Sequence, residues 1–324
     1  MTTRREFLTA SAAAAGALAV PTFWHPLAAA EKESSVTDLP IVDTHQHLWD
    51  LKLFKLPWIS GKDVQPINKN YVSSDYIAAT KGLNVVKSVY MEVNVDPAQQ
   101  TKEAEYVFDI CKKGDTPMVA AVIGGSPHEK AFSDYIKPLA KNPYLRGVRA
   151  VLHDPDRPKG LCLQPTYVDN MKLLGDLGLS YDLCMRQEEV IDGAKLAEKV
   201  PGTRFIIDHC GNMDVQRKDA AAVKACREGL KAAAALKNTM CKISGIVVTA
   251  KEDWKPADLA PNINFCLDTF GEDRVFFGGD WPVCTLKSSY AKWVAALKEI
   301  VKDRSPAFQK KLFHDNAVKF YRLA

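Results

Sequence analysis

The sequence predicts an α/β protein built as a (β/α)8 barrel, and three observations lead to this fold class. Eight short apolar runs recur along the chain, stretches with helical periodicity lie between most of them, and the typical spacing from one run to the next is roughly 30 residues, as in βαβ units. Parallel strands of such units are buried on both faces, so they read as continuous apolar runs. The alternation therefore indicates one parallel sheet closed by helices.

The predicted strands are the apolar runs themselves. In chain order they are LPIVDTH (39–45), VVKSVYMEV (85–93), MVAAVIGG (118–125), LRGVRAVL (145–152), LSYDLCM (179–185), RFIIDHC (204–210), TMCKISG (239–245) and RVFFGGDWP (274–282). Helical periodicity between them is clear in AEYVFDICKK (104–113), VIDGAKLAEKV (190–200), AAVKACREGLKAAAAL (221–236) and YAKWVAALKEIVKD (290–303).

The alternative fold is a doubly wound open sheet. Such sheets carry a Gly-x-Gly-x-x-Gly turn after the first strand or a P-loop, and the sequence contains neither motif there. The barrel is therefore favoured. Residues 49–82 are longer than an ordinary connection and contain aromatic residues with Pro and Asn, so we expect an extended loop over the barrel mouth.

The first 30 residues have the pattern of an export signal. Paired arginines, Arg4 and Arg5, precede a mildly apolar stretch, and small residues end it at Ala30. The stretch is too short for a membrane span, which needs about 20 apolar residues, so we expect twin-arginine export to the periplasm without stable membrane insertion after cleavage. The predicted organisation is a signal at 1–30, a short linker at 31–40 and a single barrel domain at 41–324.

Composition is that of an ordinary globular protein, with 47% hydrophobic and 25% charged residues and a formal charge of +4. Because the lysines are scattered, nucleic acid is excluded as an expected partner. None of the eight cysteines shows Cys-x-x-Cys spacing, and four of them end predicted strands. Since twin-arginine export moves proteins already folded in the reducing cytosol, we expect free, buried thiols.

Polar residues stand at the end of nearly every predicted strand. In a barrel these ends converge on the active site, and burying an uncompensated charge costs several kcal/mol, so their recurrence predicts one functional site at the mouth. The residues are His45, His47, Glu92, Arg149, Asp182, His209, Lys242 and Asp280.

Four of these residues are the candidates for chemistry. His45 and His47 point the same way, because side chains on a strand alternate with a period of two. Asp280 follows two glycines that permit close backbone approach and precedes Trp-Pro. Each has a structural alternative: His209 as a satisfied core histidine, and Asp280 as a helix N-cap.

The remaining polar residues are candidates for secondary roles. Glu92, Arg149 and Lys242 either contact substrate or neutralise one another around the rim, and Asp182 is a substrate contact or a hydrogen-bond support. His153, in the loop HDPDRP, is near enough to the mouth to touch substrate, although solvation is an equal alternative.

Several motifs in order resemble the amidohydrolase superfamily (amidohydrolase-related, family 2), and within it the sugar-lactonase branch of fuconolactonase-type and rhamnonolactonase-type enzymes. The motifs are VDTHQHLWD (42–50), LPWI (56–59), YDLCM (181–185), IDHCGN (207–212), KISG (242–245), FFGGDWPV (276–283) and NAVKFYRL (316–323). The resemblance implies a distorted TIM barrel in which His45, His47, His209 and Asp280 carry the chemistry.

The chain departs from that branch at two places. Ala150 stands where the branch commonly has a histidine after the strand-4 arginine, and Gly211-Asn212-Met213 stands where it often has Gly-Lys-Pro. Superfamily members with two metal ions add a lysine from strand 4 and a histidine from strand 5, but Arg149 and Asp182 occupy those places here. We therefore do not expect a binuclear centre.

The resulting prediction is a hydrolase that opens a sugar lactone or related cyclic ester. Asp280 would activate water, and His209 would polarise the carbonyl or protonate the leaving group. For His45 and His47 two alternatives stay open: they act as direct donors in a metal-independent site, or they hold one divalent ion, Zn or Mn, together with Glu92 or Asp280.

Other functions compete with this prediction. A decarboxylase or a lactone isomerase would use similar residues on the same barrel. A noncatalytic sugar-binding protein would use Trp49, Trp58 and Trp281 as stacking walls, which in the enzyme would instead bind substrate. The presence of Asp280 with the mouth histidines argues against the noncatalytic alternative.

Overall fold

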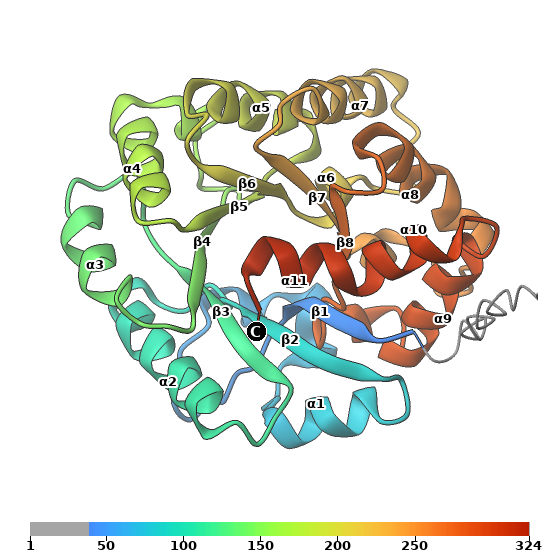
Figure 1. The fold of residues 1–324 in the computed structure, drawn as a ribbon, viewed down its shortest axis with the longest axis horizontal. Helices are drawn as coiled ribbons and strands as arrows, with labels where there is room; N and C mark the ends of the chain where they lie inside the picture. Colours follow the sequence, from blue (N-terminus) through green and yellow to red (C-terminus); the bar gives the residue numbers. More distant parts are fainter. Residues whose placement is uncertain (1–38, 324) are drawn as a thin grey trace, which may run out of the picture. The chain divides into compact units, whose positions relative to one another are not determined.

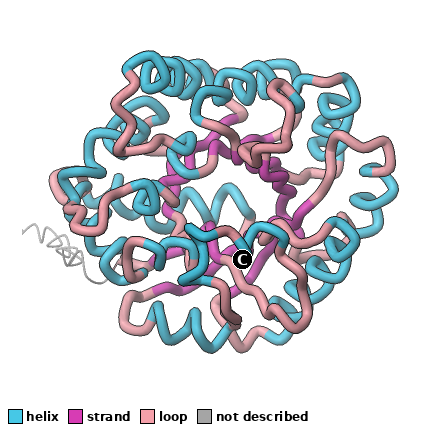
Figure 2. The backbone as a smooth tube through the Cα atoms, turned by 180° about the vertical axis from the view of Figure 1, so that it is seen from behind, coloured by secondary structure: helices cyan, strands magenta, loops and turns pink. Residues whose placement is uncertain are grey.

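A computed structural model describes residues 39–323, and in it eight parallel strands follow one another in order around a barrel (Figures 1 and 2). The predicted fold class is confirmed. The strands are β1 (Ile41–Gln46), β2 (Val85–Met91), β3 (Met118–Gly124), β4 (Leu145–Val151), β5 (Ser180–Cys184), β6 (Arg204–Ile207), β7 (Thr239–Ile243) and β8 (Val275–Phe277).

Helices in the connections cover the outside of the barrel, and the last helix, α11, lies across one of its ends (Figure 1). The helices are α1 (Ser73–Thr80), α2 (Gln100–Lys113), α3 (Phe132–Leu139), α4 (Pro165–Asp176), α5 (Val190–Lys199), α6 (His209–Asn212), α7 (Ala220–Ala234), α8 (Pro256–Phe270), α9 (Tyr290–Ile300), α10 (Pro306–Lys310) and α11 (Asn316–Tyr321).

Hydrogen bonds between the C-terminal part of β1 and the segment after β8 complete the ring of strands. Thr44 Oγ1 donates to the Phe277 carbonyl at 2.6 Å, and the amides of Asp280 and His47 donate to the carbonyls of His45 and Trp281, each at 2.8 Å. Three of the residues that the sequence selects for chemistry, His45, His47 and Asp280, therefore also close the barrel.

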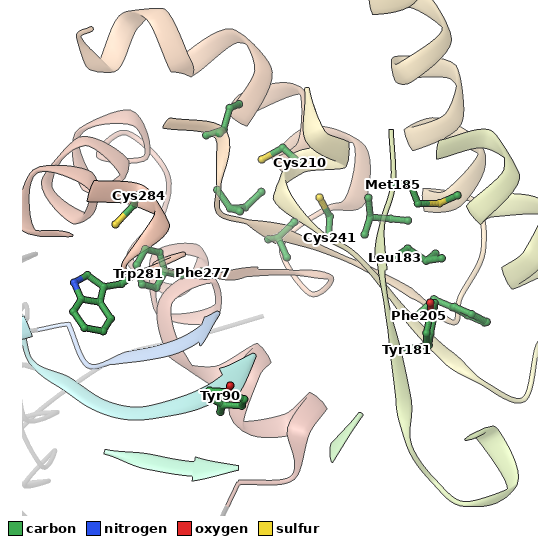
Figure 3. Close-up of a cluster of buried hydrophobic side chains, with 14 of the residues drawn as sticks. Tyr90, Tyr181, Leu183, Met185, Phe205, Cys210, Cys241, Phe277, Trp281 and Cys284 are labelled. Carbon is green, nitrogen blue, oxygen red and sulfur yellow. The ribbon is translucent and has the colours of Figure 1, made fainter. Parts of the chain in front are cut away.

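Two apolar layers fix the barrel and leave its mouth for polar residues. The larger layer lies between strands and helices, and Figure 3 shows part of it, including Tyr181, Phe205 and Phe277. The smaller cluster joins Ile206 and Phe276 of the strands to residues of α11 and the end of the chain. Because α11 closes the end of the barrel where strands begin, the opposite end is the one available for a site.

The structure differs from the sequence prediction in the long connection after β1. Residues 49–82 are not a plain loop: they contain two short 3-10 helices, η1 (Pro57–Ser60) and η2 (Lys62–Ile67), followed by α1. Asp75 caps the start of α1 by accepting a hydrogen bond from the Val72 amide at 2.9 Å. The length and the Pro and Asn content of this segment suggested a plain loop, but they also accommodate short capped helices.

Strands β6 and β8 are shorter than the apolar runs that predicted them. They end at Ile207 and Phe277, because His209 and Asp280 adopt left-handed backbone conformations with φ of 52°. Such φ values are uncommon for residues other than glycine and cluster at functional sites. In β1 an extra residue between Asp43 and Gln46, relative to β2, forms a bulge that turns the polar end of the strand.

Other predictions have different outcomes. All eight cysteines are free and buried, as expected. The predicted signal at 1–30 and most of the linker lie outside the described residues, so export stays a prediction. Within 39–323, no helix combines the length and apolarity needed to cross a bilayer.

Asp43 connects β1 to three other elements from a fully buried position. Its Oδ1 accepts from the amides of His45 and Gly279 at 2.9 and 2.7 Å, and its Oδ2 accepts from the hydroxyls of Tyr76 and Tyr290, both at 2.9 Å. A Cβ atom at position 279 would lie 2.5 Å from Asp43 Oδ2, so only glycine fits there.

Replacing this carboxylate should destabilise the whole barrel. Asp43→Ala leaves buried amide and hydroxyl donors without an acceptor, and we expect the free energy of unfolding to fall by about 3 kcal/mol or more. Urea unfolding followed by circular dichroism measures the change. The exposed Asp63 provides the control, since Asp63→Ala should alter the free energy by less than about 0.5 kcal/mol; equal effects would contradict the role of Asp43.

Candidate active site

A cavity of about 490 Å³ opens at the C-terminal ends of the strands. His47, Arg149, His209 and Asp280, from four different strand ends, lie on its surface. His45 is fully buried behind them, with its imidazole 4.4 Å from that of His209 between ring centroids. The structure thus brings together the residues that the sequence selected for chemistry.

Asp280 faces His45, which lies in β1, and His47, which directly follows this strand. Its Oδ1 lies 3.7 Å from Nε2 of His45 and 3.4 Å from Nε2 of His47. The left-handed conformation at Asp280 and the hydrogen bond from its amide to the His45 carbonyl hold the carboxylate there. These three side chains form one group of potential metal ligands.

The backbone of β2 orients His47. Its Nδ1 lies 2.9 Å from the Met91 carbonyl oxygen, and because a carbonyl only accepts hydrogen bonds, Nδ1 carries hydrogen. In a neutral imidazole the lone pair is then on Nε2, the atom that faces Asp280. An Nδ1–H bonded to a carbonyl is the usual support of a metal-ligating histidine.

The geometry of this group fits a divalent cation. Ligands held at about 2.0 to 2.2 Å from a tetrahedral Zn²⁺ lie roughly 3.4 Å from one another, and the distances from Asp280 Oδ1 to the two imidazole nitrogens are 3.4 and 3.7 Å. Two imidazoles and one carboxylate are also donors that Zn²⁺ and Mn²⁺ accept.

His45 stands between two cations. Its Nε2 lies 3.2 Å from Arg149 NH1, and its Nδ1 lies 3.3 Å from Lys242 Nζ. Burial lowers the pKa of His45 well below its usual value, and the positive charge of Lys242 lowers it further. His45 is therefore neutral. Arg149 and Lys242 both only donate hydrogen bonds, and a neutral imidazole has one acceptor nitrogen, so the ring accepts from one of the two at a time.

His209 follows β6 and is fixed by the end of β7. Its Nδ1 lies 2.9 Å from the Ser244 hydroxyl, and a Cβ at Gly245 would lie 2.2 Å from the same nitrogen, so the ring packs directly on the glycine backbone. Burial lowers the pKa of His209. Nothing in the sequence pattern indicated Ser244 as the partner of this histidine.

Glu92 has a different role from the one expected for a metal ligand. Its Oε1 accepts from Arg149 Nε at 2.5 Å, and its backbone carbonyl accepts from Arg149 NH2 at 2.8 Å. Burial opposes the charge of Arg149, but the anionic groups around it, Glu92 first among them, together outweigh burial and raise the pKa of the guanidinium. Glu92 is therefore held against Arg149 and is not in the group with His45, His47 and Asp280.

Lys242 and Asp182, which the sequence offered as substrate contacts, are fully buried and do not line the cavity. Lys242 Nζ lies 2.6 Å from Asp182 Oδ2 and 3.0 Å from Asp208 Oδ1. Burial favours the neutral amine, but the two carboxylates outweigh it and raise the pKa of Lys242. Lys242, Asp182 and Asp208 form an ion layer under His45. This layer lies too deep in the barrel to contact substrate.

Asp208 is a site residue to which the sequence analysis assigned no role. It lies 3.7 Å from His45 Nδ1 and 3.8 Å from Arg149 NH1. His45, Asp208 and His209 form a second group of potential ligands, but Lys242 already supplies a positive charge there. One feature of the sequence could have predicted this role: Asp208 is the last inward-facing position of the sixth apolar run.

The aromatic candidates divide between cavity and core. Trp49 and Trp58 line the cavity, with ring centroids 5.7 Å apart in an edge-to-face contact. Trp281 does not line it, because its ring packs between Tyr71 and Tyr76 at 5.3 and 5.4 Å. His153 is on the cavity rim with its side chain 47% exposed.

Comparison with known proteins agrees with this geometry. The model of the family described as Amidohydrolase matches residues 42–323. An L-fucono-1,5-lactonase of Burkholderia multivorans is 24% identical over 292 residues, which cover 87% of this chain and 96% of the relative.

Solved structures share the fold. An amidohydrolase from Burkholderia multivorans with bound zinc superimposes with a TM-score of 0.77 at 22% identity, over 88% of this chain and all (100%) of that chain. A 5-carboxyvanillate decarboxylase from Novosphingobium aromaticivorans, complexed with manganese, gives a TM-score of 0.63 at 15% identity, over 89% of this chain and 97% of that one.

The buried ion layer can be tested by stability. Lys242→Met leaves the carboxylates of Asp182 and Asp208 without their cation, and we expect the free energy of unfolding to fall by about 3 to 5 kcal/mol. The matched control is Lys224→Met, because the Lys224 side chain is 77% exposed, and it should change the value by less than about 0.5 kcal/mol. Chemical denaturation measures both; a Lys242 effect as small as that of the control would contradict the assignment.

Proposed function

The chain belongs to the amidohydrolase family and is a hydrolase, and we propose that it opens the ring of a small lactone with water. The observation that carries the proposal is the convergence of Asp280 with the imidazoles of His45, His47 and His209. We call these residues, together with Arg149, the floor of the cavity. Ester hydrolysis needs a nucleophilic water and a polarised carbonyl. Asp280 offers a base for the water, and the imidazoles offer hydrogen-bond donors for the carbonyl oxygen. The name of the L-fucono-1,5-lactonase relative supports a lactone as the class of substrate.

Asp280 is the general base of the proposed reaction. Its Oδ1 faces the histidines, so Oδ2 is the atom that we assign to the attacking water. Asp280 takes a proton as the water oxygen bonds to the carbonyl carbon. When the ring carbon–oxygen bond breaks, the same proton passes to the leaving oxygen, and the product is one hydroxy acid.

His209 and Arg149 stabilise the negative charge on the carbonyl oxygen. His209 is neutral because burial lowers its pKa. It therefore stabilises the oxygen through an N–H hydrogen bond and not through a positive charge. Arg149 is held by Glu92 and stays positive at the cavity surface. Donors fixed in advance around an oxyanion contribute several kcal/mol to such reactions, about 3 to 4 for one donor.

For the cofactor, we assign His45, His47 and Asp280 as the residues that hold one divalent ion, Zn²⁺ or Mn²⁺. The spacing of the three donor atoms supports this assignment, as does the Nδ1–H of His47 on Met91. When bound there, the ion supplies positive charge for the developing oxyanion. An ion held by Nε2 of His45 would take the place of the Arg149 contact at that nitrogen, and Arg149 would keep its bonds to Glu92.

Removing the base should abolish turnover. Asp280→Asn keeps the shape of the side chain but cannot accept the proton from water, and we expect kcat/KM for lactone opening to fall by about 10³-fold or more. Acid release at constant pH measures the rate, and circular dichroism checks the fold. The control is Asp214→Asn, on the same cavity but outside the floor group, which should keep the rate within a few-fold. A near-normal rate for Asp280→Asn would remove it from this role.

Metal dependence can be tested on the purified chain. We expect about one bound Zn²⁺ or Mn²⁺ per chain by elemental analysis, loss of activity after chelation, and recovery on adding either ion. His47→Ala should lower the bound metal to a small fraction, whereas His153→Ala on the rim should not. Full activity of the ion-free protein would show instead that the histidines polarise the carbonyl directly.

The same assays separate the alternatives on this barrel. Lactone hydrolysis releases one acid group per turnover and no CO₂, whereas a decarboxylase consumes an acid and releases CO₂. An isomerase returns a lactone with no net acid. Release of CO₂ from a carboxylated substrate with no lactone opening would replace the proposed function.

A further inference from the structure

Resting on lactone hydrolysis as proposed above, we propose that the substrate carries an apolar alkyl or aryl substituent and is not a polyhydroxylated sugar. The observation is the contrast between the floor of the cavity and its wall. The floor holds the charged and imidazole groups, whereas apolar side chains from several connections reach the wall above it.

Apolar residues reach the wall from connections on several sides of the barrel. They follow β2, β5, β6, β7 and β8, and a tryptophan joins them from the long connection after β1. The residues are Trp58, Val93, Met185, Met213, Val248 and Val283. A continuous apolar wall of this kind gains free energy by covering apolar substrate surface.

The two tryptophans of the cavity do not offer their N–H groups to a ligand. Trp58 Nε1 donates to the Val93 carbonyl at 2.7 Å, and Trp49 Nε1 donates to the Lys69 carbonyl at 2.6 Å. Both rings are therefore fixed in place, with their single donor already used. Trp58 contributes aromatic carbon to the wall, and the fully buried Trp49 packs against it from behind.

Several polar side chains of the wall already use their donors within the protein. Asn94 Nδ2 donates to Asp154 Oδ2 at 3.1 Å, and Asn212 Nδ2 donates to the Met185 carbonyl at 2.6 Å. The Thr249 hydroxyl donates to the Ile246 carbonyl at 2.9 Å. These bonds hold the connections together and use the donors that a sugar hydroxyl would need.

The charged groups of the wall and rim are paired in the same way. Arg186 donates to the backbone carbonyls of Asp154 and Arg157 at 2.5 and 2.8 Å. Arg217 lies 2.8 Å from Glu188, and both side chains are more than one-third exposed, at 38% and 40%. Groups in contact with water gain little from exchanging it for a substrate hydroxyl, so the rim does not favour sugars either.

These contacts set the expected preference. A hydroxyl buried against this wall without a partner lowers kcat/KM by about tenfold, because it loses its hydrogen bonds to water. A methylene group buried there raises kcat/KM by roughly fourfold. A ring with several hydroxyls and a ring with an alkyl tail should therefore differ by orders of magnitude in favour of the tail.

The test compares six-membered lactones with the full chain. We expect kcat/KM for δ-decalactone to exceed that for δ-valerolactone, the same ring without the pentyl tail, by about 30-fold or more. L-fucono-1,5-lactone should be the poorest of the three. A value for the sugar lactone equal to or above that for δ-decalactone would overturn the inference and leave the proposed lactone hydrolysis intact.

A variant places the preference on the wall itself. Val248→Thr combined with Val283→Thr adds two hydroxyls without changing side-chain shape, and it should lower the ratio of kcat/KM for δ-decalactone over δ-valerolactone by about fivefold. Ile77→Thr, at a 45% exposed position away from the cavity, is the control and should leave the ratio unchanged. An unchanged ratio in the double variant overturns the inference, whereas absence of turnover with every lactone overturns the proposed function as well.

Discussion

Asp280 Oδ1 lies within 3.7 Å of the Nε2 atoms of His45 and His47, and much of the barrel serves to hold these three acceptors together. Bringing buried acceptors together costs free energy, because each one loses hydrogen bonds to water and gains none from the others. The bulge in β1 and the left-handed backbone at Asp280 bring the side chains to one point. Asp43 then ties the amide of His45 to the glycine that precedes Asp280.

Below these three groups, a layer of paired charges keeps His45 in the required neutral state. Lys242 is balanced by Asp182 and Asp208, and Arg149 by Glu92. The net effect on His45 is to prevent its protonation, because it is buried and has a cation on each side. A neutral histidine is what either a metal ion or a hydrogen-bonded carbonyl requires, so the layer serves both forms of the chemistry.

Floor and wall of the cavity contribute separately to function. The floor is made by strand ends, which belong to the rigid barrel and hold the groups that the amidohydrolase family implies. The wall is made by the connections, where Met213 occupies one of the positions at which the sequence departs from the sugar-lactonase branch. Chemistry and substrate preference can therefore change independently on this fold.

The sequence by itself determined the fold class, the order of the strands and the positions of His45, His47, His209 and Asp280, because buried parallel strands leave a continuous apolar pattern and polar residues at their ends interrupt it. Only the tertiary structure decided which polar residues meet. Lys242 and Asp182 pair beneath His45, Glu92 holds Arg149, and Trp281 packs in the core, since depth in the barrel and the contacts between neighbouring strands are not encoded in the spacing of any one segment. Asp208 entered the site for the same reason. Whether a side chain faces the cavity or its neighbours depends on the packing of several connections at once, so the apolar wall also became visible only in the folded chain.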